Sequence, residues 1–219
     1  MDLHLLAALF AGAVTGTATG LSTRYVLHRC SGLTAPGCPA ALGVAGAGLG
    51  LFAAGGVLAA RWLPLLAVLC WLVVAGTSTD LAHRRLPNVL TLPALPVVLV
   101  ALVPAGGTAV LRAGAGALLL AGAYAVVHLV APVAMGAGDV KLAGPVGAAV
   151  TAPGWGGLPV TALLAMLVSG LVAVLALLAG RARWGSRLPH GPVLLGAALT
   201  ALLPVVTGTV TCSGATTTG

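Results

Sequence analysis

The chain has 219 residues, of which 59% are hydrophobic and only 6% are charged. A soluble domain carries about 25% charged residues, so this composition excludes a protein that is surrounded by water. Acidic residues are scarcest: the sequence holds Asp2, Asp80 and Asp139 and no glutamate. An apolar exterior suits lipid, where α-helices satisfy their own backbone polar groups. The composition therefore predicts an all-α, polytopic membrane protein, a transmembrane helical bundle in a single integral-membrane domain over residues 1–219.

The net charge of +7 does not indicate a nucleic-acid-binding protein. The ten Lys and Arg residues are scattered between apolar segments and form no basic run. Only two Tyr and two Phe are present, so the sequence supplies no aromatic platform for stacking bases. We therefore expect membrane lipids around the chain and no nucleic acid partner, and we expect the positive charges to fix its orientation in the membrane.

Polar residues divide the apolar sequence into about eight stretches, and a helix needs about 20 residues to span a bilayer. The predicted spans cover residues 3–21, 41–60, 64–79, 89–105, 113–135, 142–152, 159–180 and 193–206. The first stretch lacks the basic start of a secretory signal peptide, so we expect it to be a retained span. Its Gly12, Gly16 and Gly20 repeat along one helical face, which permits close contact with a neighbouring helix.

The distribution of basic residues predicts the orientation. With eight spans, the loops on one side carry eight basic residues: Arg24, Arg29, Arg84, Arg85, Lys141, Arg181, Arg183 and Arg187. The loops on the other side carry only Arg61 and Arg112. Because cytoplasmic loops are enriched in Lys and Arg, the first side is expected to face the cytoplasm, in a multi-pass protein of the cytoplasmic (inner) membrane.

The cysteines do not indicate a metal site. Cys30 and Cys38 are separated by seven residues in a predicted loop at 22–40, and neither belongs to a Cys-x-x-Cys pair. Cys70 lies in an apolar segment and Cys212 in the C-terminal tail. We therefore expect no metal and no cofactor.

Asp80 and Asp139 stand at the ends of predicted spans, both on the predicted cytoplasmic side. An isolated aspartate there can simply be solvated, but two at the same depth suggest a pair. Paired carboxylates share one proton because like charges close together resist ionising together. The ionised member can then take a proton from water while its partner protonates a carbonyl oxygen. The positions of the two aspartates in the sequence predict a similar depth in the membrane. They leave open whether the two side chains lie close together.

Three segments carry a recognisable pattern. Residues 80–88 read Asp-Leu-Ala-His-Arg-Arg-Leu-Pro-Asn, residues 136–142 read Gly-Ala-Gly-Asp-Val-Lys-Leu, and residues 188–192 read Leu-Pro-His-Gly-Pro. In this order they resemble the prepilin peptidase family, integral-membrane aspartic proteases with a Gly-x-Gly-Asp signature. The resemblance covers roughly residues 62–203 and implies a peptidase core at about 62–206.

The resemblance implies that Asp80 and Asp139 are the catalytic pair. It also implies the reaction, cleavage of the basic leader of type IV prepilins or pseudopilins at the cytoplasmic face. The positions expected to support the site are Pro87, Asn88, Gly136, Gly138, Lys141, Pro189, Gly191 and Pro192.

The sequence departs from the family in two places. Larger members carry a zinc-binding cytoplasmic domain with two Cys-x-x-Cys pairs and methylate the new N-terminus. That zinc site is absent here, and N-methylation with S-adenosylmethionine is not expected. His190 replaces the family's aromatic residue in the third segment, which is expected to alter how the segment packs near the site.

Several readings stay open at this level. His83 either influences Asp80 or is a solvated loop histidine, and Lys141 either lowers the pKa of Asp139 or only orients the chain. His128, inside a predicted span, is expected to be a neutral side chain that is hydrogen-bonded between helices. Two other functions are compatible with the acids: a small transporter that binds a proton or cation, and a Gly-x-Gly-Asp protease with other substrates.

Overall fold

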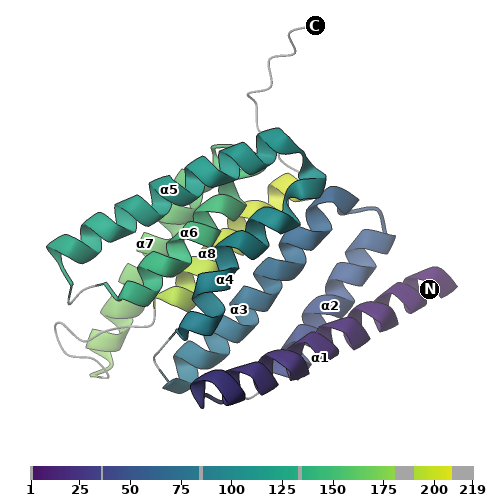
Figure 1. Ribbon diagram of the computed structural model, residues 1–219, viewed down its shortest axis with the longest axis horizontal. Helices are drawn as coiled ribbons and strands as arrows, with labels where there is room; N and C mark the ends of the chain where they lie inside the picture. Colours follow the sequence, from purple (N-terminus) through teal and green to yellow (C-terminus); the bar gives the residue numbers. More distant parts are fainter. Residues whose placement is uncertain (1, 36, 84–85, 133–134, 181–189, 209–219) are drawn as a thin grey trace, which may run out of the picture.

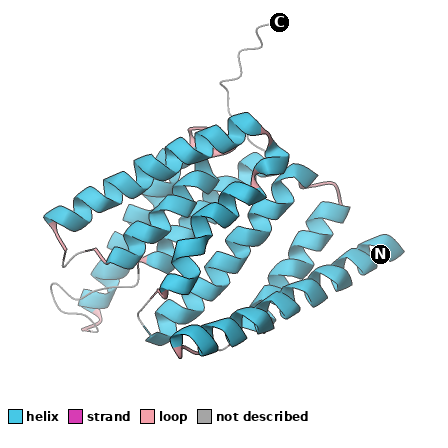
Figure 2. Cartoon of the chain, in the orientation of Figure 1, coloured by secondary structure: helices cyan, strands magenta, loops and turns pink. Residues whose placement is uncertain are grey.

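A computed structural model describes residues 2–35, 37–83, 86–132, 135–180 and 190–208, and these residues form helices joined by short loops without a strand (Figure 2). The helices are α1 (Leu3–Ser31), α2 (Cys38–Ala54), α3 (Leu63–His83), α4 (Asn88–Ala101), α5 (Gly107–Val130), α6 (Ala137–Thr151), α7 (Gly157–Leu178) and α8 (Gly191–Val206). Two short 3-10 helices, η1 (Ala60–Trp62) and η2 (Val103–Ala105), precede α3 and follow α4. The predicted all-α architecture is confirmed.

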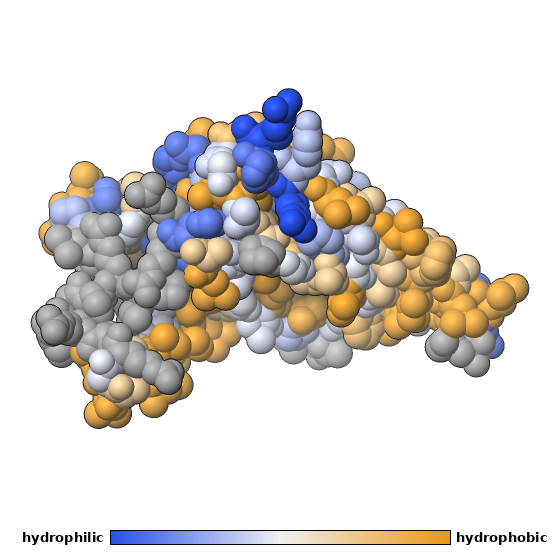
Figure 3. All heavy atoms as spheres, turned by 90° about the horizontal axis from the view of Figure 1, so that it is seen from below, coloured by the Kyte–Doolittle hydropathy of each residue, from blue (hydrophilic) through white to orange (hydrophobic). Residues whose placement is uncertain are grey.

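Five segments are long and apolar enough to cross a membrane. They are Leu3–Ser31, Ala60–His83, Asn88–Ala105, Gly107–Val130 and Gly157–Leu178. Two shorter apolar helices, Cys38–Ala54 and Gly191–Val206, accompany them. Apolar side chains cover much of the surface, and hydrophilic residues gather in one patch of the view in Figure 3. The chain is therefore a multi-pass membrane protein, and each of the eight predicted spans coincides with one helix.

Helix boundaries differ from the predicted spans where polar residues continue a helix. The predicted loop at 22–40 is wrong over its first part, because α1 continues to Ser31. The hydroxyl of Ser22 donates to a carbonyl one turn earlier in the helix, so a polar residue here does not end the helix. The helix ends at Gly32, whose φ of 64° is in the left-handed region that favours glycine. The hydropathy of the sequence indicates where the apolar, lipid-facing segment ends. A helix can continue beyond that point.

Two further boundaries were predicted wrongly for the same reason. Helix α5 begins at Gly107, so Arg112 lies inside this helix instead of in the preceding loop. Helix α6 begins at Ala137, ahead of the predicted start at residue 142. The latter difference places Asp139 within the first turn of α6.

The helices lie in the order shown in Figure 1, with the pair α1 and α2 at one edge, next to α3. Helix α6 is the central element, since α4, α5, α7 and α8 all pack against it. Every residue of α6 from Leu142 to Thr151 is buried. This helix is enclosed by protein, which explains why it can be shorter than a helix that faces lipid.

Small residues allow the closest helix contacts. A Cβ added at Gly12 or Gly16 of α1 would collide with the backbone of α2, at Gly46 and Leu42 respectively. Gly20 meets the start of α2 in the same way, at Pro39. The predicted role of the glycine stripe in helix contact is confirmed, because any side chain would hold these two backbones apart.

Candidate active site

Asp80 lies in the last turn of α3 and is only 8% exposed. The preceding residue, Thr79, is fully buried and donates its hydroxyl to the carbonyl of Ala75. A carboxyl group at such a position is removed from most of the surrounding solvent. Burial of this kind is unfavourable for a charged group that has no partner.

Asp139 lies in the first turn of α6, directly after the glycine-rich segment. Gly136 is the N-cap of this helix, and the Asp139 N–H donates to the Gly136 carbonyl oxygen at 3.1 Å. Burial raises the pKa of the Asp139 carboxyl above its usual range, while the charge of His190 and a backbone hydrogen bond from Gly136 partly oppose this. Burial thus favours the protonated form of Asp139, while His190 and Gly136 favour its ionised form.

The two aspartates, 59 positions apart by their residue numbers, lie within electrostatic range of each other, since the charge of Asp139 acts on the Asp80 carboxyl. Helices α4 and α8 each pack against both α3 and α6, and so hold the ends that carry the aspartates together. The structure thus brings together the two predicted site acids. Like charges that act on each other resist ionising together, so ionisation of Asp139 disfavours ionisation of Asp80.

Leu86 joins the three motif segments. A Cβ added at Gly138 would lie 3.4 Å from Leu86 Cβ, and one added at Gly191 would lie 3.2 Å from Leu86 Cδ1. A Cβ added at Gly76 of α3 would lie 3.8 Å from Cδ2 of the same leucine. The glycines at 138 and 191 therefore let one leucine side chain pack against the starts of α6 and α8 together.

The other predicted supporting residues surround this junction. Pro87 is buried and is the N-cap of α4, and Asn88 is the first residue of that helix. The Lys141 ammonium donates to the Asn88 side-chain oxygen at 2.8 Å, which ties the start of α6 to the start of α4. Pro192 occupies the first turn of α8, where proline is tolerated. Pro189 lies outside the described residues.

His190 makes the contacts that the sequence did not reveal. Its Nε2 lies 2.9 Å from the hydroxyl of Tyr124 on α5, and its Nδ1 lies 2.7 Å from the hydroxyl of Ser169 on α7. The ring of Tyr124 also approaches the imidazole, with 5.7 Å between the centroids. Neither Tyr124 nor Ser169 belongs to a motif segment, and their only signal in the sequence is a polar group within an apolar helix.

The sequence model of the Type IV leader peptidase family matches residues 66–175, which is half of the chain. The chain belongs to this family. The matched region contains both aspartates, Leu86 and the hydroxyl partners of His190.

Curated relatives of this leader peptidase homologue carry one name. A protein of Pseudomonas aeruginosa named "Prepilin leader peptidase/N-methyltransferase" is 36% identical over 144 residues, covering 62% of this chain and 48% of the relative. A protein of Aeromonas hydrophila with the same name is 35% identical over 152 residues, covering 67% of this chain and 51% of the relative. The chain spans about half the length of the curated relatives it matches. No solved structure matches it.

Two other histidines of the leader peptidase fold have structural contacts. His83 Nε2 lies 3.1 Å from the Thr34 backbone nitrogen, which connects the end of α3 to the loop after α1. His128 Nδ1 lies 2.8 Å from the carbonyl oxygen of Met135, across the connection between α5 and α6. The hydrogen-bonded state predicted for His128 is confirmed, but its partner is the following loop.

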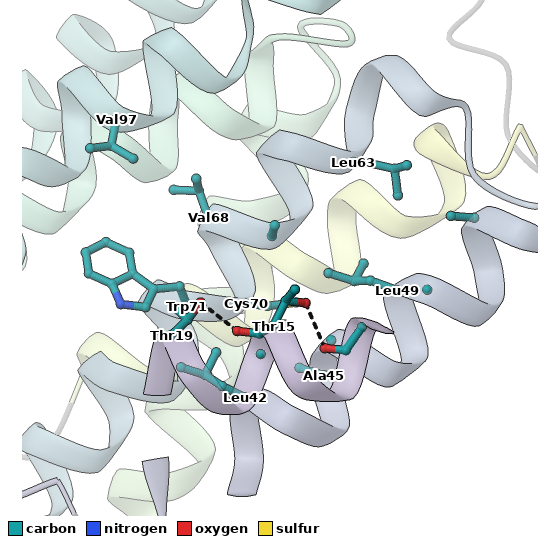
Figure 4. A pocket seen from close by; sticks show the side chains of 16 residues that line it. Thr15, Thr19, Leu42, Ala45, Leu49, Leu63, Val68, Cys70, Trp71 and Val97 are labelled. Atoms are coloured by element: carbon teal, nitrogen blue, oxygen red, sulfur yellow. Dashed lines mark hydrogen bonds between the residues drawn. The ribbon is translucent and has the colours of Figure 1, made fainter. Parts of the chain in front are cut away.

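An apolar cavity of about 600 Å³ lies away from the aspartates, between α1, α2 and α3 (Figure 4). Thr19 of α1 and Trp71 of α3 line it, and Val97 lines it from α4. Neither Asp80 nor Asp139 lines this cavity. Across the residues that the structure describes, no three His, Cys, Asp or Glu side chains group as metal ligands, and Cys30, Cys38 and Cys70 are free thiols.

Proposed function

We propose that this chain is an aspartic endopeptidase that cleaves the leader of type IV prepilins or pseudopilins, with Asp80 and Asp139 as its catalytic pair. The observation that carries the proposal is the position of the two acids, Asp80 in the last turn of α3 and Asp139 in the first turn of α6, at the junction where Leu86 packs against the starts of α6 and α8. Membership of the leader peptidase family and the printed names of its relatives support a peptidase acting on prepilins. A transporter that uses the same acids gains no support from them.

In the proposed reaction, one carboxyl of the pair is ionised and the other is protonated. The ionised carboxylate takes a proton from a water molecule, whose oxygen attacks the carbonyl carbon of the scissile peptide bond. The protonated partner donates its proton to the carbonyl oxygen as the tetrahedral intermediate forms. Breakdown of this intermediate releases the leader and requires that a proton reach the leaving amine.

Glycines give the substrate room to approach this pair. The backbone at Gly136 lies against the Asp139 carboxylate, since a Cβ there would be 3.4 Å from Oδ2. With no side chain at this position, an extended peptide can come close to the carboxylate. We assign positioning roles to Asn88 and Lys141, whose hydrogen bond fixes the start of α6 relative to α4.

We place the chain in the cytoplasmic membrane with the site facing the cytoplasm, because the basic residues concentrate on that side. The proposal covers proteolysis by a peptidase core at about 62–206 and leaves methylation out, since the described cysteines form no zinc site. It needs no metal or other cofactor.

Co-expression with a prepilin, followed by measurement of the prepilin mass, tests this assignment. Asp80→Asn and Asp139→Asn are each expected to abolish leader removal while the protein still enters the membrane. Asp2→Asn, at the exposed third aspartate, is the matched control and is expected to cleave normally. Complete cleavage by either single variant would refute the catalytic pair.

A further inference from the structure

The imidazole of His190 stands between three helices, and its environment suits two protonation states. Both ring nitrogens face hydroxyl groups, those of Tyr124 and Ser169. A hydroxyl can donate or accept, whereas a neutral imidazole has one donor and one acceptor and an imidazolium has two donors. Either form of His190 can therefore be fully hydrogen-bonded without moving the ring. A histidine held in this way can change its charge while its position stays fixed.

Asp139, in the first turn of α6, lies next to Gly191, the residue that follows this histidine. Burial lowers the pKa of His190 below its usual value, and the charge of Asp139 partly opposes this lowering. Burial raises the pKa of Asp139, and the charge of His190 partly opposes this rise. The backbone also brings the two together, because a Cβ at Gly191, the residue after His190, would lie 3.6 Å from Asp139 Oδ1. The interaction is thus reciprocal and rests on the placement of α8 against α6.

Among the described residues, the following groups lie around His190 and Asp139. Tyr124 is its partner from α5, and Ser169 is its partner from α7. Asp80 of α3 is coupled to Asp139. His128, one helical turn beyond Tyr124, contacts the Met135 carbonyl. The acid that acts directly on the imidazole is Asp139.

We propose that His190, held between Tyr124 and Ser169, is a positioning residue whose charge keeps Asp139 ionised as the pH falls. This inference rests on the proposed function, because it assigns to the catalytic pair a third group that regulates it. At low pH the imidazolium favours the Asp139 carboxylate, so the ionised member of the pair persists to more acidic conditions. Without that charge, Asp139 binds its proton at a higher pH and the pair loses its base.

The first test is the pH dependence of leader cleavage by purified protein. We expect His190→Phe, which restores the family's aromatic residue type, to move the acid limb of cleavage to higher pH. His190→Gln, which hydrogen-bonds but carries no charge, is expected to move the limb in the same direction. At the pH where the wild-type rate is half-maximal, both variants should lose roughly threefold or more in rate. His4→Phe, at an exposed position near the start of α1, is the matched control and should follow the wild-type profile.

The glutamine variant separates charge from hydrogen bonding. A wild-type acid limb in His190→Gln would overturn the proposal, because His190 would then act only by filling and bonding its site. An unshifted limb in His190→Phe would overturn it as well. Tyr124→Phe alone is expected to move the acid limb to higher pH, as the His190 variants do. Combined with His190→Phe it should cause little further shift, because Tyr124 acts through His190.

The second test does not depend on activity. The imidazole signal that disappears in His190→Phe identifies His190 in an NMR titration of the detergent-solubilised protein. Its titration midpoint is expected to fall in Asp139→Asn, because the negative charge that favours the imidazolium is removed. An unchanged midpoint would overturn the coupling. If the wild-type protein cleaves no prepilin and yet this midpoint falls, the proposed function fails and the coupling between His190 and Asp139 stands.

Discussion

Gly191, the first residue of α8, lies directly against Asp139, since a Cβ at this glycine would be 3.6 Å from the carboxylate oxygen Oδ1. The same Cβ would lie 3.2 Å from Leu86 Cδ1, at the end of a side chain that can move. One added carbon therefore fits with a small adjustment, whereas a branched side chain adds atoms where Leu86, Asp139 and Leu142 already lie within 3.6 Å. The glycine sets the distance between the start of α8 and the acid.

Gly191→Val is expected to displace Asp139 and to reduce leader cleavage severely, by about tenfold or more, because misplacement of a catalytic group by about 1 Å can cost a hundredfold in rate. Gly191→Ala is expected to retain most activity. Gly196→Val on the same helix is the control, since a Cβ at Gly196 would meet open space. Cleavage rates of the three variants, at matched membrane levels, test this. Equal rates for the two valine variants would contradict it.

Burial of Asp139 predicts a pH-dependent stability. The pKa of Asp139 is raised above its ordinary value of 3.8 in the folded protein. At a pH between 3.8 and the folded-state pKa, the folded state therefore binds more protons than the unfolded state. The contribution of Asp139 to the free energy of unfolding therefore falls as the pH rises from below 3.8 through the folded-state pKa. Asp139→Asn removes this loss.

The measurement compares His190→Phe with the double variant His190→Phe/Asp139→Asn, because the coupled titration of His190 is then absent from both. Unfolding midpoints in detergent across the acid to neutral range should show the double variant gaining stability relative to the single variant as the pH rises. A constant difference between the two would show that burial does not perturb Asp139.

The contact between α1 and α2 predicts opposite effects of two alanines on one helix. A Cβ at Gly46 would collide with the backbone of Gly12, which cannot rotate away, whereas one at Gly48 would meet open space. Gly46→Ala is expected to destabilise the protein by about 1–3 kcal/mol. Gly48→Ala is expected to be neutral or to stabilise by up to about 1 kcal/mol, as alanine favours the helix. Denaturant titrations in mixed micelles distinguish the two, and similar midpoints would show that α1 and α2 are not in close contact.

The position of Leu86 predicts that the packing of the three motif segments depends on its side chain. Leu86→Ala removes Cδ1, the atom near both Gly138 and Gly191, and leaves only the Cβ contact to Gly138. It is expected to destabilise by about 2 kcal/mol, at the lower end for a leucine-to-alanine change because the side chain is half-buried. The Leu86→Ala variant should also cleave the leader more slowly, because the starts of α6 and α8 are less well fixed. Leu92→Ala, at a leucine of α4 that is 63% exposed, is the control and should be nearly neutral. Equal stability of both variants would remove Leu86 from the junction.

The sequence alone determined the class of the protein and its helices. Low charge and long apolar stretches indicate a helical membrane protein, because lipid tolerates such an exterior and a helix satisfies its backbone polar groups within one continuous apolar stretch. Its three aspartates also limited the candidates for acid chemistry, and the spacing put Asp80 and Asp139 at span ends on one side. Helix ends such as Ser31 and Ala137 escaped prediction, because polar side chains extend a helix past the apolar region.

Only the tertiary structure decided which side chains meet. Tyr124 and Ser169 precede His190 by 66 and 21 residues, and neither distance along the chain fixes the rotation of a helix about its axis. Close packing around the central helix α6 sets those rotations, since glycines such as Gly138 let the side chain of a neighbouring segment, here Leu86, approach the helix backbone. Contacts of this kind arise when several helices pack together, and no single helix encodes them.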